Sequence, residues 1–232
     1  MKATIYVIPG SHPCRTGLLM LEHKGIPHRR VVLKPGFHAA AVRILGFPGQ
    51  TVPAVKLDGR RVQGTRQIAR ALDELKPEPR LLPEDERLRA AVEEAERFGE
   101  EVLQPAARRL VAAAGHRDMA SLRDHAASGR LGLLLSRGTR RRRMIFRVLV
   151  RRVGATQQQE REDREHLPGW LDRIDAWISE GVLNGRELNA ADLQIVTSLA
   201  LIDYVLELRS SLASRPAGAL MDRVLPEGAG RA

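Results

Sequence analysis

Cysteine is almost absent from this chain of 232 residues. The single Cys14 excludes an internal disulfide and is typical of a protein from a reducing compartment. No run of about 18 apolar residues occurs, so a membrane-spanning helix is not expected. The apolar run at residues 5–8 is too short for the core of a secretion signal. We therefore expect a cytoplasmic protein.

Aromatic residues are also scarce, at 3% of the chain, so the core must consist mainly of Leu, Val, Ile and Ala. Acidic residues are fewer than basic ones, 28 against 38, which gives a net charge of +10. Such a charge can indicate nucleic acid or an anionic membrane as a partner. Arg greatly outnumbers Lys, however, which is also typical of a GC-rich coding sequence. The charge by itself is therefore a weak argument for nucleic acid.

Strand-like and helix-like segments alternate through the first 76 residues. The strands are predicted at residues 4–8, 30–33 and 52–57, with a fourth returning after the turn at Asp58-Gly59. Helices are predicted at residues 13–24 and on the stripe Ile68, Ala71, Leu72 and Leu75, and residues 37–45 form a short helix or an irregular loop. The predicted order is βαβαββα, with one parallel and one antiparallel pairing at least.

The remaining chain is separated from this region by a proline-rich segment. We place a linker at residues 77–84, an all-helical domain at 85–228 and a loose tail at 229–232, after a first domain at 1–76. Helical stripes are predicted at residues 88–103 with a kink at Pro105, at 140–152, at 167–178 and from 190 to about 208. Residues 115–138 carry a weaker pattern.

Three local patterns support this organisation: SHPCR at residues 11–15, TVPAV at residues 51–55 and NGRELNAADL at residues 184–193. Together they resemble the glutathione transferase superfamily over nearly the whole chain, and the zeta- and omega-type bacterial members in particular. The resemblance implies an α+β thioredoxin-like N-terminal domain followed by an all-α helical bundle. In the third pattern, Asn189 is the expected helix N-cap and Asp192 its capping-box partner.

A proline at the entrance to a strand, Pro53, is unusual because proline cannot donate to a sheet ladder. The resemblance implies a cis bond before Pro53 and a role for Val52 in pairing its backbone with a bound thiol peptide. The alternative is an edge-strand proline without a ligand.

The resemblance places Ser11 at the active position, counted back from Lys24-Gly25-Ile26. A hydroxyl there donates a hydrogen bond to the ligand thiolate, assisted by the positive end of the helix. Cys14 takes the second cysteine position of a C-x-x-C pattern, either as a buried inert thiol or as a group for thiol–disulfide exchange. We prefer Ser11 as the catalytic residue, and we expect His12 to be solvated.

The resemblance also implies a site for the γ-glutamyl end of the thiol at Gly64, Thr65 and Arg66. Thr65 keeps the expected hydroxyl, and the helix N-terminus offers N–H groups to a carboxylate. Gly64 replaces the acidic or amide residue of most members. The cosubstrate is therefore glutathione or a related low-molecular-weight thiol, and no metal is implied.

A basic amphipathic helix is predicted at residues 140–152, with Arg140, Arg143, Arg147 and Arg151 on one face. We favour a solvated helix whose arginines pair with the acids Glu160, Glu162, Asp163 and Glu165. The alternatives are peripheral contact with an anionic membrane, an anionic substrate or nucleic acid. Nucleic acid is disfavoured because Phe146 is the only aromatic residue for stacking.

The predicted function is conjugation of a thiol to a small-molecule electrophile, bound near the helix that carries Phe98 and Val102. The alternative is a noncatalytic ligand-binding or interaction protein that keeps the fold. A third hypothesis is disulfide exchange through Cys14. The resemblance also implies a homodimer, as in many members.

Overall fold

The structure, a computed structural model, describes residues 2–122 and 139–226. Its N-terminal region contains one four-stranded sheet, made of β1 (Ala3–Val7), β2 (His28–Val32), β3 (Ala54–Leu57) and β4 (Arg60–Gln63). The strand order is β2-β1-β3-β4. β1 pairs with β2 in parallel and with β3 antiparallel, and β3 and β4 form an antiparallel hairpin.

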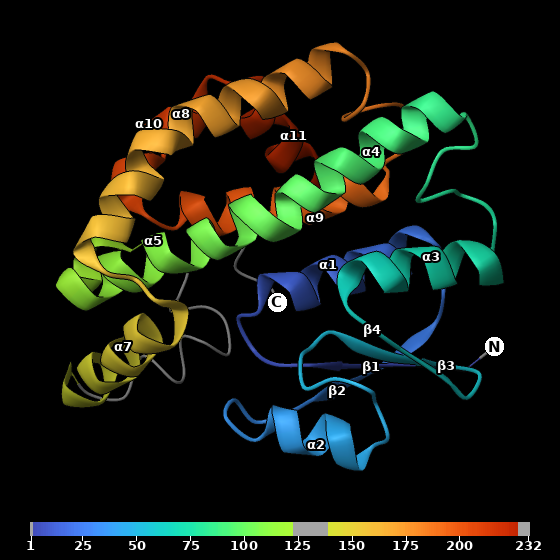
Figure 1. Cartoon of the computed structure of the whole chain (residues 1–232), viewed down its shortest axis with the longest axis horizontal. Coiled ribbons are helices and arrows are strands. Elements are labelled where there is room, and N and C mark those ends of the chain that lie inside the picture. Colours follow the sequence, from blue (N-terminus) through green and yellow to red (C-terminus); the bar gives the residue numbers. More distant parts are fainter. Residues whose placement is uncertain (1, 123–138, 227–232) are drawn as a thin grey trace.

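Helices α1 (His12–His23) and α3 (Thr65–Leu75) lie on one side of this sheet, and α2 (His38–Ile44) lies on the other (Figure 1). The order βαβαββα and the thioredoxin-like architecture predicted from the sequence are confirmed. The hairpin turn has positive φ at Asp58 (44°) and Gly59 (98°), as a tight two-residue turn requires. β3 begins two residues later than predicted, because Val52 and Pro53 lie outside the sheet ladder.

The helical region follows, as predicted. Its longer helices are α4 (Glu86–Phe98), α5 (Gln104–Arg117), α7 (Thr139–Val153), α8 (Gln157–Ser179), α9 (Ala190–Asp203) and α11 (Pro216–Val224). Shorter elements are the turns η1 (Gly99–Leu103), η2 (Met119–Ser121) and η4 (Leu206–Leu208) and the helix α10 (Ser210–Ala213). α9 lies in the middle and is buried almost on every side, with α1 and α4 packed against it (Figure 1).

Three helix details differ from the sequence prediction. The bend before Pro105 is a π-helical turn at Gly99–Leu103, and Pro105 lies in the first turn of α5, where its missing N–H costs little. α8 begins about ten residues earlier than predicted because Thr156 caps it, and it continues through Pro168. α9 ends at Asp203 instead of about residue 208, because Val205 leaves the helix and pairs with Leu122.

The predicted capping box at α9 is present. The Asn189 Oδ1 accepts hydrogen bonds from the N–H groups of Ala191 and Asp192 at 2.9 and 3.1 Å. In return, the Asp192 Oδ2 accepts one from the Asn189 N–H at 2.9 Å. Asp192 also receives the N–H of Asn184 at 2.7 Å, so the whole turn before α9 is fixed.

The predicted linker is packed between the two regions. Leu81 and Leu82 are buried, and their N–H groups donate to the Asp73 carboxylate of α3, each at 2.9 Å. The Leu81 carbonyl accepts the N–H of Ala190 at 2.8 Å. One apolar core runs through both regions. In the described ranges, no helix has the length and apolar character needed to cross a membrane.

Candidate active site

The candidate site is built around the N-terminus of α1. Ser11 is the N-cap, and its Oγ accepts a hydrogen bond from the Cys14 N–H at 3.4 Å. Pro13 occupies the first turn. A serine hydroxyl accepts through its lone pairs, so the single O–H of Ser11 stays available as a donor. The half-buried Ser11 therefore points one hydrogen-bond donor at the positive end of a twelve-residue helix.

Cys14 lies one turn into α1 and is only 2% exposed. Burial raises the pKa of its thiol, although hydrogen bonds from Ser11 and at Ile8 and the nearby positive charges of Arg30 and Arg108 act in the opposite direction. A thiol with a raised pKa and little exposure is a poor nucleophile. Of the two catalytic candidates from the sequence, Ser11 is thus the one that faces solvent.

The loop before β3 lies against α1. The Val52–Pro53 peptide bond is cis. A Cβ at Gly17 would lie 3.3 Å from the Pro53 Cβ, so the glycine lets the proline ring pack closely on α1. Gln63 supports the loop, since its side chain binds the Gly49 N–H at 2.7 Å and the Thr51 carbonyl at 2.5 Å.

Val52 leaves its backbone polar groups unused. Within residues 2–122 and 139–226, neither its N–H nor its carbonyl forms a hydrogen bond, and its side chain is half-buried. Backbone groups of an ordered segment normally find a partner in the protein or in water. An extended peptide could pair with Val52 in the way that a strand adds to a sheet edge.

The N-terminus of α3 lies directly beside this loop, because the Gly64 N–H donates to the Pro53 carbonyl at 3.1 Å. Gly64 is the N-cap, with φ 88° and ψ 145°, a conformation that favours glycine. No side chain caps α3, and Thr65 is its first residue and is 2% exposed. The structure therefore brings together Val52, Pro53, Gly64 and Thr65.

Arg66 is directed differently. Its guanidinium lies 3.6 Å from Glu96, 3.8 Å from Glu100 and 4.0 Å from Glu101, all on the helical side of the molecule. Arg70, one turn later, forms an ion pair with the same Glu96 at 2.8 Å. Arg66 is thus engaged in a contact between α3 and the α4–η1 segment, whereas the other predicted ligand residues surround the Pro53 loop.

Two polar residues near Ser11 were not assigned from the sequence. His12 is buried, contrary to the expected solvated side chain, and burial lowers its pKa to about 3, assisted by the positive charge of Arg108. Its Nε2 has no hydrogen-bond partner in the described residues. Arg108 of α5 is half-buried, and burial lowers its pKa while Cys14 acts in the opposite direction.

Arg108 has no carboxylate partner among the described residues, unlike Arg66 and Arg70. Its charge is close enough to affect both His12 and Cys14, which places it by the α1 N-terminus. In the sequence, Arg108 stood out only by its place one helical turn after Gln104, whose backbone acts on the pKa of His12. This residue adds an unpaired positive charge to the site.

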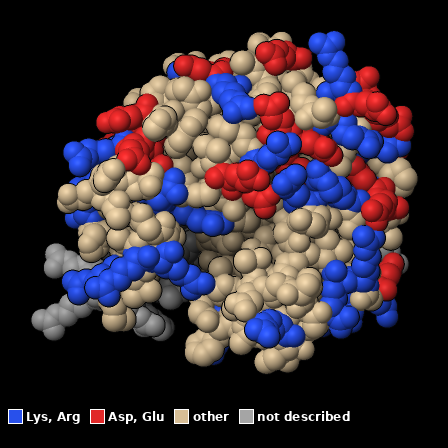
Figure 2. Space-filling view, viewed as in Figure 1, with Lys and Arg blue, Asp and Glu red and all other residues tan. Residues whose placement is uncertain are grey.

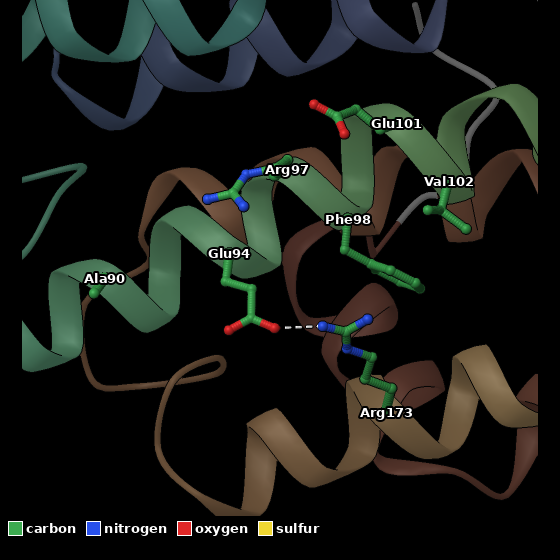
Figure 3. Close-up of a pocket in the computed structure, with 7 residues that line it drawn as sticks. All are labelled: Ala90, Glu94, Arg97, Phe98, Glu101, Val102 and Arg173. Carbon is green, nitrogen blue, oxygen red and sulfur yellow. Dashed lines mark hydrogen bonds and ion pairs between the residues drawn. The ribbon is translucent and has the colours of Figure 1, made fainter.

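Phe98 and Val102, which were expected beside the electrophile, lie away from the site at the N-terminus of α1. Phe98 and Val102 line a cavity of about 360 Å³ together with Ala90, Glu94, Arg97, Glu101 and Arg173 (Figure 3). Phe98 packs edge-on against Trp177 of α8, with Arg173 5.0 Å from the Phe98 ring centre. This cavity faces α8, and α4 separates it from α1 and α3. The α5 residues Gln104 and Arg108 are the ones that approach α1.

The surface beside α7 is hollowed. Figure 2 shows a hollow between the N-terminal region and α7, with a band of Lys and Arg on the α7 side. Exposed α7 residues in the described part include Arg147, Arg151 and Arg152. The described residues contain no group of three or more His, Cys, Asp or Glu side chains that could hold a metal ion.

Comparisons with known proteins agree with this geometry. Residues 5–80 match the family described as glutathione S-transferase, N-terminal domain. No curated protein sequence matches the chain. The N-terminal region thus matches a glutathione S-transferase domain family, and the chain as a whole shares its fold with glutathione S-transferases.

Solved structures of similar fold cover nearly the whole chain. A β-etherase from Sphingobium is 19% identical with a TM-score of 0.70, over 99% of this chain and 97% of its own. A glutathione S-transferase of Ceriporiopsis subvermispora, in complex with glutathione, is 19% identical with a TM-score of 0.64, over 97% and 95%. A Methylobacterium radiotolerans enzyme in complex with glutathione sulfonate is 16% identical with a TM-score of 0.61, over 99% and 93%.

Proposed function

We infer that this protein binds glutathione or a related thiol peptide and conjugates it, through its sulfur, to an electrophile. The observation that carries the inference is the unpaired backbone of Val52 beside cis Pro53. Ser11 caps α1, the helix on which Pro53 packs, and the N-terminus of α3, which no side chain caps, lies beside the Pro53 carbonyl. Two proteins of similar fold bind glutathione or glutathione sulfonate in their crystal structures.

Each of these groups has a chemical role in the proposal. The Val52 N–H and carbonyl pair with the backbone of the thiol peptide. The N–H groups at the start of α3, with Thr65, bind its γ-glutamyl carboxylate. Ser11 donates its O–H to the sulfur while its oxygen keeps the contact from the Cys14 N–H.

The reaction needs the thiolate. Binding beside the α1 N-terminus and the unpaired Arg108 favours loss of the thiol proton to solvent, because both stabilise negative charge. The sulfur lone pair then forms a bond to the electrophilic carbon. With a chlorinated nitrobenzene as the electrophile, the carbon–chlorine bond breaks and chloride leaves with its electron pair. Fixed positions of the two reactants lower the barrier further.

The experiment compares conjugation of glutathione to a chlorinated nitrobenzene by wild type, Ser11→Ala and Ser11→Asp. The aspartate keeps an N-cap acceptor for the Cys14 N–H but cannot donate to a thiolate and repels it. We expect kcat/KM to fall about 100-fold or more for both variants, as when a donor to a developing anion is removed. Ser179→Ala, at an exposed serine of α8, is the control.

Two results would decide against this function. One is wild-type protein without conjugation activity and without a thermal shift on adding glutathione or other thiol peptides. The other is equal activity of wild type and Ser11→Asp with both proteins folded. A loss in Ser11→Ala alone would indicate only a missing helix cap, which is worth about 1 kcal/mol.

One observation favours the noncatalytic alternative. Gly64 replaces the acidic or amide residue, and the Gln67 Oε1 lies 2.6 Å from the place where a Cβ at Gly64 would be. The space for that side chain is thus occupied by Gln67. A protein that is stabilised by thiol peptides but conjugates none of several electrophiles would support a binding function. If thiol peptides stabilise the Gln67→Ala variant more than they stabilise wild type, Gln67 limits thiol binding.

A further inference from the structure

The most exposed large apolar side chains lie on two helices. In the described part of the chain, the four most exposed are Ile44 (86%), Phe37 (73%), Met144 (61%) and Val148 (58%). Phe37 is the N-cap of α2 and Ile44 its last residue, whereas Met144 and Val148 belong to α7.

The rotation of α7 about its axis is fixed by packing. Phe146 is 4% exposed and fills the space at Gly115 of α5, where an added Cβ would lie 2.1 Å from its ring. Leu149, Val150 and Val153 pack on the alanines of α5 and on Ala155. The opposite side of the helix therefore has to face solvent, and any side chain larger than glycine at residue 115 would displace α7.

The solvent side of α7 mixes apolar and cationic residues. Met144, Arg147, Val148 and Arg151 follow the spacing i, i+3, i+4 and i+7, and all four are exposed. We call these four residues the α7 face. An exposed helix that only needs solubility would carry polar residues where Met144 and Val148 stand, so the apolar pair requires an explanation.

Two of the acids predicted to pair with this helix bind arginines of α5 in the described residues. Asp163 binds Arg109 of α5 at 2.7 Å, and Glu160 binds Arg117 of α5 at 2.8 Å. In the ranges that the structure covers, Arg147, Arg151 and Arg152 form no salt bridge. Glu160 and Asp163 thus pair with α5 and not with Arg147, Arg151 or Arg152.

We propose that the α7 face binds the surface of an anionic lipid bilayer. Arginines at the edge pair with lipid phosphates, and Met144 and Val148 enter the boundary between headgroups and acyl chains. A nucleic acid would use the arginines but offers little to two exposed aliphatic side chains, and stacking aromatics are missing from the α7 face. The bilayer fits both the cationic and the apolar residues of the α7 face.

The test is co-sedimentation of the full chain with vesicles. Vesicles of phosphatidylcholine and phosphatidylglycerol in equal parts should bind the protein, and vesicles of phosphatidylcholine alone should not. Arg147→Gln should weaken binding about five-fold, and Arg147→Gln with Arg151→Gln about 25-fold, given the usual contribution of a basic residue near an anionic surface. High salt should weaken binding of the wild type.

Two matched variants separate the α7 face from net charge and general stickiness. Arg161→Gln removes an exposed arginine of α8 that forms no salt bridge in the described residues, and it should change binding less than two-fold. Met144→Ser with Val148→Ser should weaken binding to vesicles clearly, whereas Leu206→Ser, at a side chain 44% exposed on η4, should not. Thermal unfolding of each variant confirms that it is folded.

Three outcomes would overturn the proposal. Equal losses in Arg147→Gln and Arg161→Gln would mean that only net charge matters. Unchanged binding of the Met144→Ser, Val148→Ser variant would leave no role for the apolar pair. Tighter binding to a single-stranded oligonucleotide than to anionic vesicles, lost in the arginine variants, would assign the face to nucleic acid instead.

Discussion

The arginines of α3 and those of α7 differ in what surrounds them. Arg66 and Arg70 meet a cluster of acids on the α4–η1 segment, including Glu96, which is 0% exposed. Arg147 and Arg151 are exposed and have no acidic partner in the described residues. The first group holds two halves of the molecule together, and the second leaves charge for a partner. The same side chain thus has a structural or a binding role according to the acids that folding places beside it.

Arg108 falls between the two groups, since it is half-buried like the first and unpaired like the second. Burying a cation without an anion is costly. The unpaired Arg108 guanidinium therefore stabilises an anion that binds at the N-terminus of α1. Our proposal uses a thiolate as that anion.

The largest effect should come from breaking the α3–α4 contact. In Arg70→Met, the Glu96 carboxylate loses its 2.8 Å partner and keeps only Arg66 at 3.6 Å. We expect the free energy of unfolding to fall by about 3 kcal/mol, as for a buried pair that loses one member. Arg147→Met should change it by less than about 0.5 kcal/mol. Urea denaturation measures both, and equal changes would remove the distinction between the two groups.

The second effect concerns pH and His12. Its folded pKa is about 3 against 6.5 normally, so the unfolded chain binds the extra proton and stability is lost as the pH falls below about 6.5. Between about pH 6.5 and pH 4.5 this group should cost about 2 kcal/mol. His12→Asn should remove that part of the pH dependence, and His116→Asn, at an exposed histidine of α5, should leave it unchanged. A pH profile of His12→Asn equal to wild type would contradict this.

The third effect tests Arg108 as a positioning charge for the thiolate. Arg108→Met should lower kcat/KM for conjugation about ten-fold, equal to about 1.4 kcal/mol. Without the positive charge, the apparent pKa of the bound thiol should rise, and Arg108→Lys should restore part of it. The free energy of unfolding should not fall, because no ion pair is lost. If the pH–rate profile of Arg108→Met is not shifted from that of wild type, the Arg108 charge does not stabilise the thiolate.

The smallest effect concerns Cys14, the nearest group that could supply Arg108 with an anion. Because burial raises the pKa of its thiol, Cys14 should stay neutral and react slowly with iodoacetamide until the protein unfolds. Cys14→Ala should leave conjugation unchanged and cost about 1 kcal/mol of stability. Rapid labelling of the native protein would show a reactive thiolate and revive disulfide exchange.

Elements with short-range signals could be predicted well from the sequence. The turn at Asp58-Gly59 and the box of Asn189 and Asp192 involve residues within a few positions of one another. The order βαβαββα follows from such signals, because β-branched runs, turns and helical stripes are each local. The start of α1 also emerged, since Pro13 is a local signal for the first turn of a helix.

Features that depend on distant packing could not be predicted. The end of α9 depends on Leu122 pairing with Val205, and the exposure of the α7 arginines depends on α5 reaching Glu160 and Asp163 first. His12 looked solvated beside Pro13, yet the approach of α5 buries it. Phe98 was expected near the electrophile, yet it packs on Trp177 of α8.

By itself, the sequence determined the two-part architecture, the cap at Asn189 and the turn at Asp58-Gly59, because steric limits and hydrogen bonds of the backbone act within a few residues. Only the tertiary structure decided which charges are paired. Arg66, Arg108 and Arg147 are chemically alike in the sequence, and each role depends on the distance to a carboxylate far along the chain. Electrostatic energy depends on that distance and on burial, and both are properties of the folded molecule.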